Sequence, residues 1–264
     1  MDDLETVLLD YDDDSGIGTL TMNRPDSLNA LNGQLSRDIV EGLRRLEERN
    51  EDADGVALRA VVLEGAGEKA FCAGADIGGF SSDSAGGSSA RSHYQFIVDF
   101  PAPVIAKIDG YCLGGGLETA LACDFRLASE ESTFGFPEVN LGLLPGAGGV
   151  QYVTKLAGPA VAKELAMFGD HVPAERAGEL GIVNRVYPGD EFDDEVASFA
   201  EKLAGQAPLA VQGIKKSARV AVETGLEEGL RYDREQFSTL LNTEDFEEGA
   251  AAFSEKRDPE FEGR

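Results

Sequence analysis

Two glutamates, each beside a glycine-rich segment, are the residues of this chain whose type and spacing are best suited to chemistry. Glu118 lies in GYCLGGGLETALACD at residues 110–124, and Glu138 lies in FGFPEVNLGLLPGAGG at residues 134–149. A pair of carboxylates can hold and activate one water molecule, or move protons at carbon. Glycine has no side chain, so its backbone N–H can approach a ligand closely. The two segments together indicate acid–base chemistry beside a backbone anion site.

The anion site needs two backbone donors, and the sequence offers a candidate for each. Gly115 precedes a short helical segment, whose first N–H groups lie at the positive end of the helix dipole. The N–H of Ala75, in the turn-forming segment FCAGADI at residues 71–77, could point into the same space. Two converging amides would stabilise an oxyanion. The structural alternatives are that these glycines only form tight turns, that Glu118 is a helix N-terminal charge and that Glu138 caps a turn.

The elements that must position these residues alternate between strands and helices. The first 25 residues predict a β-hairpin, because apolar side chains alternate before the turn sequence DDDSG. Apolar residues then recur every three or four positions from Leu28 to Leu46, which predicts a helix with one apolar face. Short apolar runs predict parallel strands at residues 58–63, 104–108 and 124–128, with a short helix at 117–123 between the last two. Helical patterns follow at residues 161–168, 173–180 and 192–203, with a strand at 182–186.

Strand signals disappear from about residue 206 onward. Leu226, Leu230, Phe237 and Leu241 lie on one face of a helical tail that has little core of its own. We therefore expect the tail to pack on another part of the protein or on a neighbouring subunit. The alternation of strands and helices before it predicts an α/β fold with right-handed crossovers. The predicted organisation is a core of residues 1–203 that holds the site, followed by a C-terminal helical region of residues 204–264.

Composition and charge exclude several functional classes. No apolar run is long enough to span a membrane, and the first residues are acidic where a signal peptide would be basic, so we expect a cytoplasmic protein. Three dispersed cysteines and two distant histidines predict neither a disulfide framework nor a metal site. The net charge of −26 opposes binding to nucleic acid or to an anionic membrane. Because concentrated salt screens self-repulsion, the same charge suggests a protein that works in high salt, as in a halophile; an ordinary acidic protein is the alternative.

Two rival functions find little support in the sequence. GAGEKA at residues 65–70 fits a loose dinucleotide-binding pattern, but the following FCAG predicts another turn rather than a helix. The Gly-x-Ser-x-Gly elbow of α/β-hydrolases is not in the sequence.

The low-complexity stretch at residues 78–90 is either a flexible cover over the site or a plain surface insertion.

With these motifs in this order, the chain resembles the enoyl-CoA hydratase/isomerase (crotonase) family over nearly its whole length. The matching segments are MNRPDSLNAL at residues 22–31, FCAGADI at 71–77, PVIA at 103–106, residues 110–124 and 134–149, and FSEKR at 253–257. The resemblance implies a spiral of ββα units, followed by a C-terminal helical region that forms homotrimers or dimers of trimers. It implies an acyl-CoA substrate, with coenzyme A as part of that substrate and no separate cofactor or metal.

The resemblance also assigns roles to individual residues. Ala75 and Gly115 supply the two N–H groups of the oxyanion hole, and Glu118 and Glu138 are the two catalytic glutamates. The expected substrate or CoA contacts are Arg24, Lys69, Ala73, Asp76, Ile77, Gly78 and Gly114. The chain departs from the family at Asp26 and Gly78, where many members carry lysines that meet the CoA. Tail residues Lys256 or Arg257 are candidate replacements.

The function that this resemblance implies is that of an enoyl-CoA hydratase in fatty-acid β-oxidation. Such an enzyme adds water reversibly, with syn geometry, across the 2,3 double bond of 2-enoyl-CoA thioesters to give 3-hydroxyacyl-CoA. Members that lack one of the two glutamates tend to catalyse other reactions, so the presence of both favours the hydratase. The alternative is a Δ3,Δ2-enoyl-CoA isomerase or another acyl-CoA enzyme of the same family.

Overall fold

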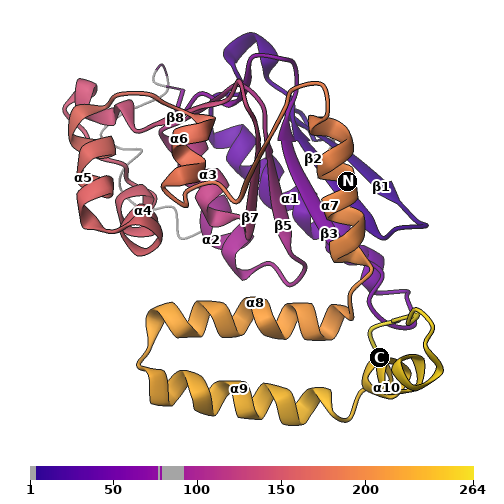
Figure 1. The fold of residues 1–264 in the computed structure, drawn as a ribbon. Coiled ribbons are helices and arrows are strands. Elements are labelled where there is room, and N and C mark those ends of the chain that lie inside the picture. The colour runs from indigo at the N-terminus through magenta and orange to yellow at the C-terminus, as the bar shows by residue number, and fades with distance from the viewer. Residues whose placement is uncertain (1–3, 77, 79–91) are drawn as a thin grey trace.

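The chain folds as a repeated unit in which a strand of a large sheet leads to a short strand of a second sheet and then to a helix (Figure 1). The structure is a computed structural model that describes residues 4–76, 78 and 92–264. The large sheet has the order β1 (Val7–Asp12), β2 (Ile17–Met22), β3 (Ala60–Gly65), β5 (Val104–Ile108), β7 (Phe125–Ser129) and β10 (Arg185–Tyr187). The second sheet has the order β4 (Ala70–Cys72), β6 (Tyr111–Leu113), β8 (Thr133–Gly135) and β9 (Val172–Pro173).

Helices connect the strands and cover the sheets. The α-helices are α1 (Gly33–Glu47), α2 (His93–Asp99), α3 (Gly115–Ala122), α4 (Gly149–Ala157), α5 (Pro159–Phe168), α6 (Ala174–Glu179), α7 (Phe192–Ala204), α8 (Pro208–Glu223), α9 (Leu226–Leu240) and α10 (Glu244–Glu255). Short 3₁₀ helices are η1 (Pro25–Ser27), η2 (Glu48–Asn50) and η4 (Pro137–Leu141). The units β3–β4–α2 and β5–β6–α3 repeat the same path, and β7–β8 begins a third turn. The predicted α/β spiral of ββα units is therefore confirmed.

The central strands of the large sheet are buried on both faces, because they alternate apolar side chains between two cores. In β3, Val61 and Leu63 face the main core, while Val62 faces α7 with Ile105 and Leu127 from the neighbouring parallel strands. This two-sided burial explains why the central strands read as continuous apolar runs. The observed strands β3, β5 and β7 begin within two residues of their predicted starts.

The helix predicted from Leu28 begins later, at Gly33. Leu28 and Asn29 have left-handed backbone, with φ of 52° and 55°, so the chain turns before the helix instead of entering it. The buried Asn29 stabilises this turn, because its Nδ2 donates to the carbonyls of Ala66 (3.0 Å) and Ala70 (2.8 Å). The turn brings Leu31 beside Ala75 in an isolated parallel bridge. The apolar residues thus keep a helical spacing from Leu28 onward, although the turn held by Asn29 interrupts the backbone before the helix begins.

Two other predictions at element level need correction. The segment after residue 70 was expected to be a turn, but Ala70–Cys72 is strand β4, buried throughout. The strand expected at residues 182–186 is only Arg185–Tyr187, because the N–H groups of Ile182 and Val183 instead bond to Ala177 O at the end of α6. The conclusion that no helix follows GAGEKA at residues 65–70 is confirmed.

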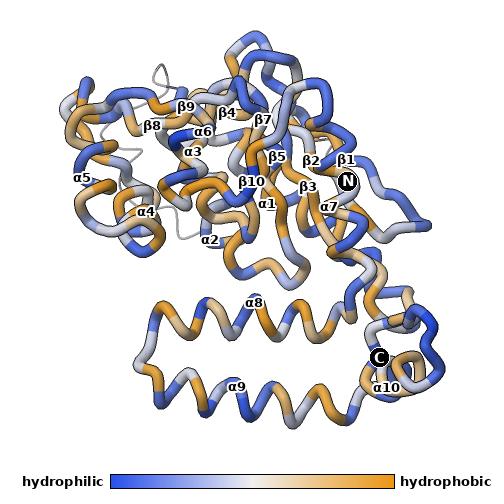
Figure 2. Tube along the Cα trace, viewed as in Figure 1, coloured by the Kyte–Doolittle hydropathy of each residue, from blue (hydrophilic) through white to orange (hydrophobic). Residues whose placement is uncertain are grey.

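The last three helices stand apart from the sheets (Figure 1). Helices α8 and α9 run side by side below the rest of the molecule, and both alternate apolar and polar residues along their length (Figure 2). The end of the chain returns to the core: Arg59 donates to Phe261 O (2.8 Å), and Val56 N donates to Glu262 O (2.9 Å). The division into residues 1–203 and 204–264 stays a prediction. No helix among the described residues is long and apolar enough to cross a membrane.

Candidate active site

Three segments of the candidate site follow the carboxyl ends of three neighbouring parallel strands. Ala75 follows β4, Gly115 follows β6, and Glu138 follows β8. Parallel strands end at one edge of a sheet, which is where α/β proteins commonly bind ligands. The hydrogen bond from Gly114 N to Gly135 O (2.9 Å) continues the β6–β8 ladder to this edge. The repeated unit therefore gathers residues that are far apart in sequence.

Each glycine of the triplet 114–116 meets a different steric requirement. Gly114 has φ of 50°, and a Cβ on it would lie 2.8 Å from Glu138 Oε1. A Cβ on Gly116 would lie 2.1 Å from Cys72 O, so α3 can approach β4 only with glycine there. A Cβ on Gly115 would enter the space between α3 and Ala75, 3.8 Å from Ala75 N. Only a residue without a side chain leaves this space open and keeps both neighbours close.

The N–H groups of Ala75 and Gly115 border this space. Gly74 O accepts from Leu31 N and Asp76 N donates to Leu31 O, each at 2.8 Å. Because successive N–H groups in extended backbone point in opposite directions, the Ala75 N–H points away from Leu31. Gly115 is the first residue of α3, where N–H groups have no partner within the helix. In the described part of the chain, neither N–H donates to another residue. Both N–H groups are therefore available to a ligand, and their assignment as an oxyanion hole stays a prediction.

Glu118 is held rigidly in the first turn of α3. Its side chain is buried, and Oε1 accepts from Ala147 N (2.7 Å) and Gly149 N (2.8 Å). The second of these donors is the first residue of α4, so a helix terminus faces the carboxylate. Burial raises the pKa of Glu118, while the backbone N–H groups of residues 147–149 lower it in part. One oxygen is thus fixed by the loop, and Oε2 has no hydrogen bond to a described residue.

Glu138 has a poorer environment for a charge. It lies in η4, with Oε2 buried and without a hydrogen-bond partner in the described residues. Burial raises the pKa of Glu138, and the nearby carboxylate of Glu118 raises it further. A buried acceptor without a protein partner is expected to serve a water molecule or a ligand. The two carboxyls therefore lie close enough for Glu118 to raise the pKa of Glu138. One oxygen of each has no hydrogen-bond partner among the described residues and is available to water or a ligand.

The remaining predicted contacts differ in their surroundings. Arg24 Nη2 forms an ion pair with Asp76 Oδ2 (3.0 Å) and Arg24 Nη1 donates to Ala30 O, so these two predicted contacts are joined to each other. Ala73 is half-buried in the chain after β4, whereas Lys69 and Gly78 are exposed. Ile77, and the proposed cover at residues 79–90, lie outside the described residues. Their roles toward CoA stay predictions.

The tail cations do not join this site within one chain. Arg257 binds Glu248, with Nη2 2.7 Å from Oε2, and also pairs with Glu255. Lys256 and Arg257 follow α10, which lies well apart from α3 (Figure 1). The CoA role suggested for them would require a neighbouring subunit.

Several residues near the site were not recognised from the sequence. Tyr94, in the first turn of α2, has its hydroxyl 3.1 Å from the Cβ position of Gly115. His93 is buried behind it and lies 3.1 Å (Nε2) from Thr119 Oγ1. No motif marks these residues, because their roles arise from how α2 packs on α3. His93 packs against Thr119 of α3.

At the far end of α3, Arg126 places a buried positive charge. It donates to Cys123 O (2.9 Å), Ala120 O (3.4 Å) and Ile182 O (2.7 Å) and is 5% exposed. The carbonyls of Ala120 and Cys123 lie at the negative end of α3, so the cation stabilises this helix. Among the described residues no group of three potential metal ligands occurs, and independence from metals stays a prediction.

Comparisons with known proteins agree with this geometry. The family model for enoyl-CoA hydratase/isomerase matches residues 12–264. The chain is 39% identical to a probable enoyl-CoA hydratase of Rhizobium meliloti, covering 98% of this chain and 99% of the other. It is 38% identical to a carnitinyl-CoA dehydratase of Salmonella enteritidis, covering 93% and 94% of the two chains. The crystal structure of enoyl-CoA hydratase from Bacillus anthracis superposes with a TM-score of 0.86 at 34% identity, covering 98% and 100%.

The chain belongs to the enoyl-CoA hydratase/isomerase family, and its fold is the crotonase fold. The match to the family and to these relatives shows that the protein is an enzyme of the hydratase, or hydro-lyase, type.

The raised pKa of Glu138 predicts a pH-dependent cost to stability. The folded protein holds this proton more tightly than the unfolded chain, so ionising the carboxyl lowers the free energy of unfolding as pH rises through the folded pKa. Glu138→Gln should therefore be more stable than the wild type at about pH 8, on the order of 1 kcal/mol or less after solvent screening, and the gain should shrink towards about pH 5. Urea unfolding at both pH values measures it. Glu164→Gln, on the exposed side of α5, is the matched control. A gain that is the same at both pH values would contradict this origin.

Proposed function

We propose that the protein catalyses the reversible syn addition of water across the 2,3 double bond of 2-enoyl-CoA thioesters, giving 3-hydroxyacyl-CoA. The observation that carries the proposal is that the buried carboxyl of Glu118 and the half-buried carboxyl of Glu138 lie beside two backbone amides that have no partner among the described residues. Hydration of an enoyl thioester needs these parts: a base for water, an acid for the α-carbon and donors for the thioester oxygen.

The different environments of the glutamates support a division of roles. Glu118 accepts hydrogen bonds from two backbone N–H groups, which favour its ionised form. Glu138 has a buried oxygen with no hydrogen-bond partner among the described residues. Glu118 is therefore assigned as the base that takes a proton from water as the water oxygen bonds to the β-carbon. Glu138, in its protonated form, delivers a proton to the α-carbon. Pairs of carboxyls with contrasting surroundings commonly divide acid and base work in this way.

The amides of Ala75 and Gly115 are assigned to the thioester oxygen. When water adds to the β-carbon, electron density moves through the α-carbon to this oxygen, and an enolate forms until the α-carbon is protonated. Two N–H donors held by β4 and by the start of α3 would stabilise that charge, and losing one such donor typically costs ~10²–10³ in rate. The reverse reaction, loss of water from 3-hydroxyacyl-CoA, uses the same groups with their protonation states exchanged.

Glu138→Gln should lower the rate of hydration by about 10²–10⁴ because it removes the proton donor while keeping the side-chain shape. The measurement is the loss of crotonyl-CoA absorbance, with Glu164→Gln as the control for a change of charge on the surface. A Glu138→Gln protein with the wild-type rate would refute the mechanism. Parallel assays with longer 2-enoyl-CoAs and with a 3-enoyl-CoA separate a hydratase from the alternative isomerase, since only an isomerase moves the double bond of the 3-enoyl substrate.

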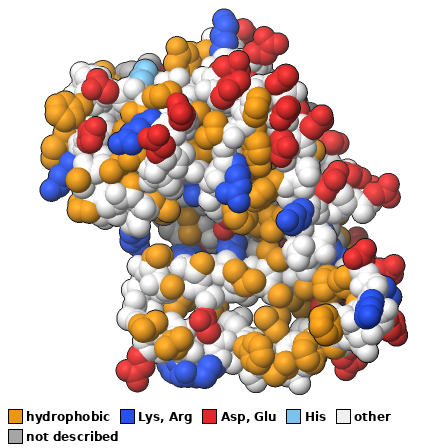
Figure 3. Space-filling view, viewed as in Figure 1, with side chains coloured by type: hydrophobic (Ala, Val, Ile, Leu, Met, Phe, Trp, Pro, Cys, Tyr) orange, Lys and Arg blue, Asp and Glu red, His pale blue; other side chains and the backbone are white. Residues whose placement is uncertain are grey.

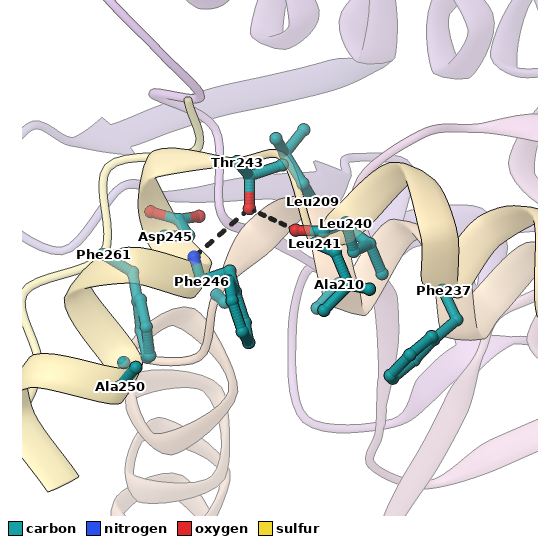
Figure 4. Close-up of a pocket in the computed structure, with 12 residues that line it drawn as sticks. Leu209, Ala210, Phe237, Leu240, Leu241, Thr243, Asp245, Phe246, Ala250 and Phe261 are labelled. Carbon is teal, nitrogen blue, oxygen red and sulfur yellow. Dashed lines mark hydrogen bonds between the residues drawn. The ribbon is translucent and has the colours of Figure 1, made fainter.

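The protein is further proposed to work as a homotrimer or a dimer of trimers. Large apolar side chains are exposed on α8, α9 and α10, including Ile214 (68%), Leu226 (80%) and Phe237 (66%). Apolar side chains gather over this lower part of the molecule (Figure 3). Phe237 also lines a pocket between α8, α9 and α10, together with Leu209, Leu240, Phe246 and Phe261 (Figure 4). Contiguous exposed apolar surface of this kind is typical of an interface, and a second copy of the chain is the proposed occupant.

Light scattering should give three or six protomers for the wild type. Phe237→Glu should shift the protein towards smaller species, because a charge would be buried in the proposed interface. Leu8→Glu, at an exposed apolar side chain of β1, is the control and should leave the assembly unchanged. A monomeric wild type at working concentrations would contradict the proposal.

A highly saline cytoplasm is the proposed setting. The net charge of −26 supports it, because only concentrated salt screens so much surface repulsion, and three free, buried cysteines fit a reducing compartment. The midpoint of thermal unfolding should rise by at least several degrees between about 0.1 M and 2 M KCl, as the Debye length falls from ~10 Å to below ~3 Å. Sucrose at matched osmolality is the control for solvent exclusion. Full stability in dilute buffer would count against this setting.

A further inference from the structure

The hydroxyl of Tyr94 borders the same space as the two oxyanion amides. A Cβ placed on Gly115 would lie 3.1 Å from Tyr94 Oη and 3.8 Å from Ala75 N. The third neighbour of this point is the apolar Leu31 Cδ1, at 3.0 Å. A polar hydroxyl and a backbone amide therefore meet around one small volume next to Gly115, with an apolar wall beside them.

The electrostatic surroundings keep this phenol neutral and able to donate. Burial raises the pKa of Tyr94 and the nearby carboxylates of Glu118 and Glu138 raise it further, while the neighbouring Thr119 hydroxyl lowers it in part. Both catalytic candidates thus lie close enough to influence the hydroxyl. Ionisation of Tyr94 beside them would add a further negative charge to a site that must accept an enolate, so the neutral form of the phenol is the one that can donate.

A buried polar chain fixes Tyr94 relative to Gly115. Thr119 Oγ1 donates to Gly115 O (2.9 Å), so its single proton is used and it must accept from His93 Nε2–H (3.1 Å). Burial lowers the pKa of His93 to about 3, which keeps the ring neutral in this tautomer. The His93 ring lies 3.8 Å from the Tyr94 ring between centroids. The start of α2 and the first turn of α3 are therefore tied together where the amide and the hydroxyl meet.

We propose that the Tyr94 hydroxyl is a third hydrogen-bond donor to the thioester oxygen and thus a further catalytic residue. The inference rests on the proposed hydration reaction. As charge develops on this oxygen, the bond from the hydroxyl strengthens together with those from the Ala75 and Gly115 amides, so Tyr94 acts mainly in the transition state. No covalent step and no net proton transfer by Tyr94 is involved.

Tyr94→Phe tests this, because it removes only the hydroxyl and keeps the ring against His93. With crotonyl-CoA, kcat should fall about 10- to 100-fold with KM changed less than about threefold, as for loss of an oxyanion donor that two others partly replace. Tyr187→Phe, on β10 away from the site, is the matched control and should match the wild type. An unchanged kcat, or a loss confined to KM, would overturn the proposal and leave Tyr94 as a wall of the pocket.

Acetoacetyl-CoA provides a readout that does not depend on turnover. Its β-keto thioester forms an enolate that absorbs in the near ultraviolet, and donors at the thioester oxygen lower the pH at which the bound ligand ionises. The titration midpoint of bound acetoacetyl-CoA should be about one pH unit higher in Tyr94→Phe than in the wild type or Tyr187→Phe, which is a tenfold loss of enolate stabilisation. An identical midpoint would refute the third donor. If the wild type does not hydrate crotonyl-CoA, the proposed reaction fails, yet this titration still decides whether Tyr94 donates.

Discussion

The parallel register of three short strands is the constraint on which the site depends. β4, β6 and β8 pair so that Cys72 lies opposite Cys112, and Cys112 opposite Phe134. Their carboxyl ends therefore coincide, and the chain leaves each strand at the same edge. A slip of one residue in any strand would reverse its side chains and move its exit point. Burial of β4 and of the last two residues of β6 and of β8 makes such a slip costly, so the core of the fold, rather than the loops, sets the distances within the site.

Close approach is the second requirement, and it explains the density of glycine at the site. Helix α3 begins against β4 so tightly that Gly116 tolerates no Cβ, and all its residues are buried. The loop that ends at Gly149 reaches back to hold Glu118. The carboxylate is thus fixed by groups that belong to the next turn of the spiral. Neighbouring ββα units therefore hold each other in place. As a result, Glu118 and Glu138 differ in burial and in hydrogen bonding.

The sequence predicted the residues that motifs mark and missed those that packing places. Ala75, Gly115, Glu118 and Glu138 were named in advance and do gather at one edge, because glycine-rich turns leave a signature in the sequence. The helix start at Leu28 was wrong because one buried asparagine overrides the apolar spacing. Strand β4 was missed because three residues are too short for a period to show. Tyr94 was missed because its place depends on how two helices meet, which no local pattern encodes. The assigned roles in catalysis stay predictions until the variants are measured.

The buried Arg126 changes the electrostatic field of helix α3. Its guanidinium binds the carbonyls of Ala120 and Cys123 at the tail of the helix, so a full internal charge offsets the negative pole at the end opposite Gly115. Dissolved ions screen charges at the surface, but they cannot reach a group enclosed in the protein. Salt therefore weakens the contribution of this buried charge to the field of α3 very little. The salt concentration around this acidic surface can therefore change while the electrostatic field of the buried Arg126 inside the protein stays nearly the same.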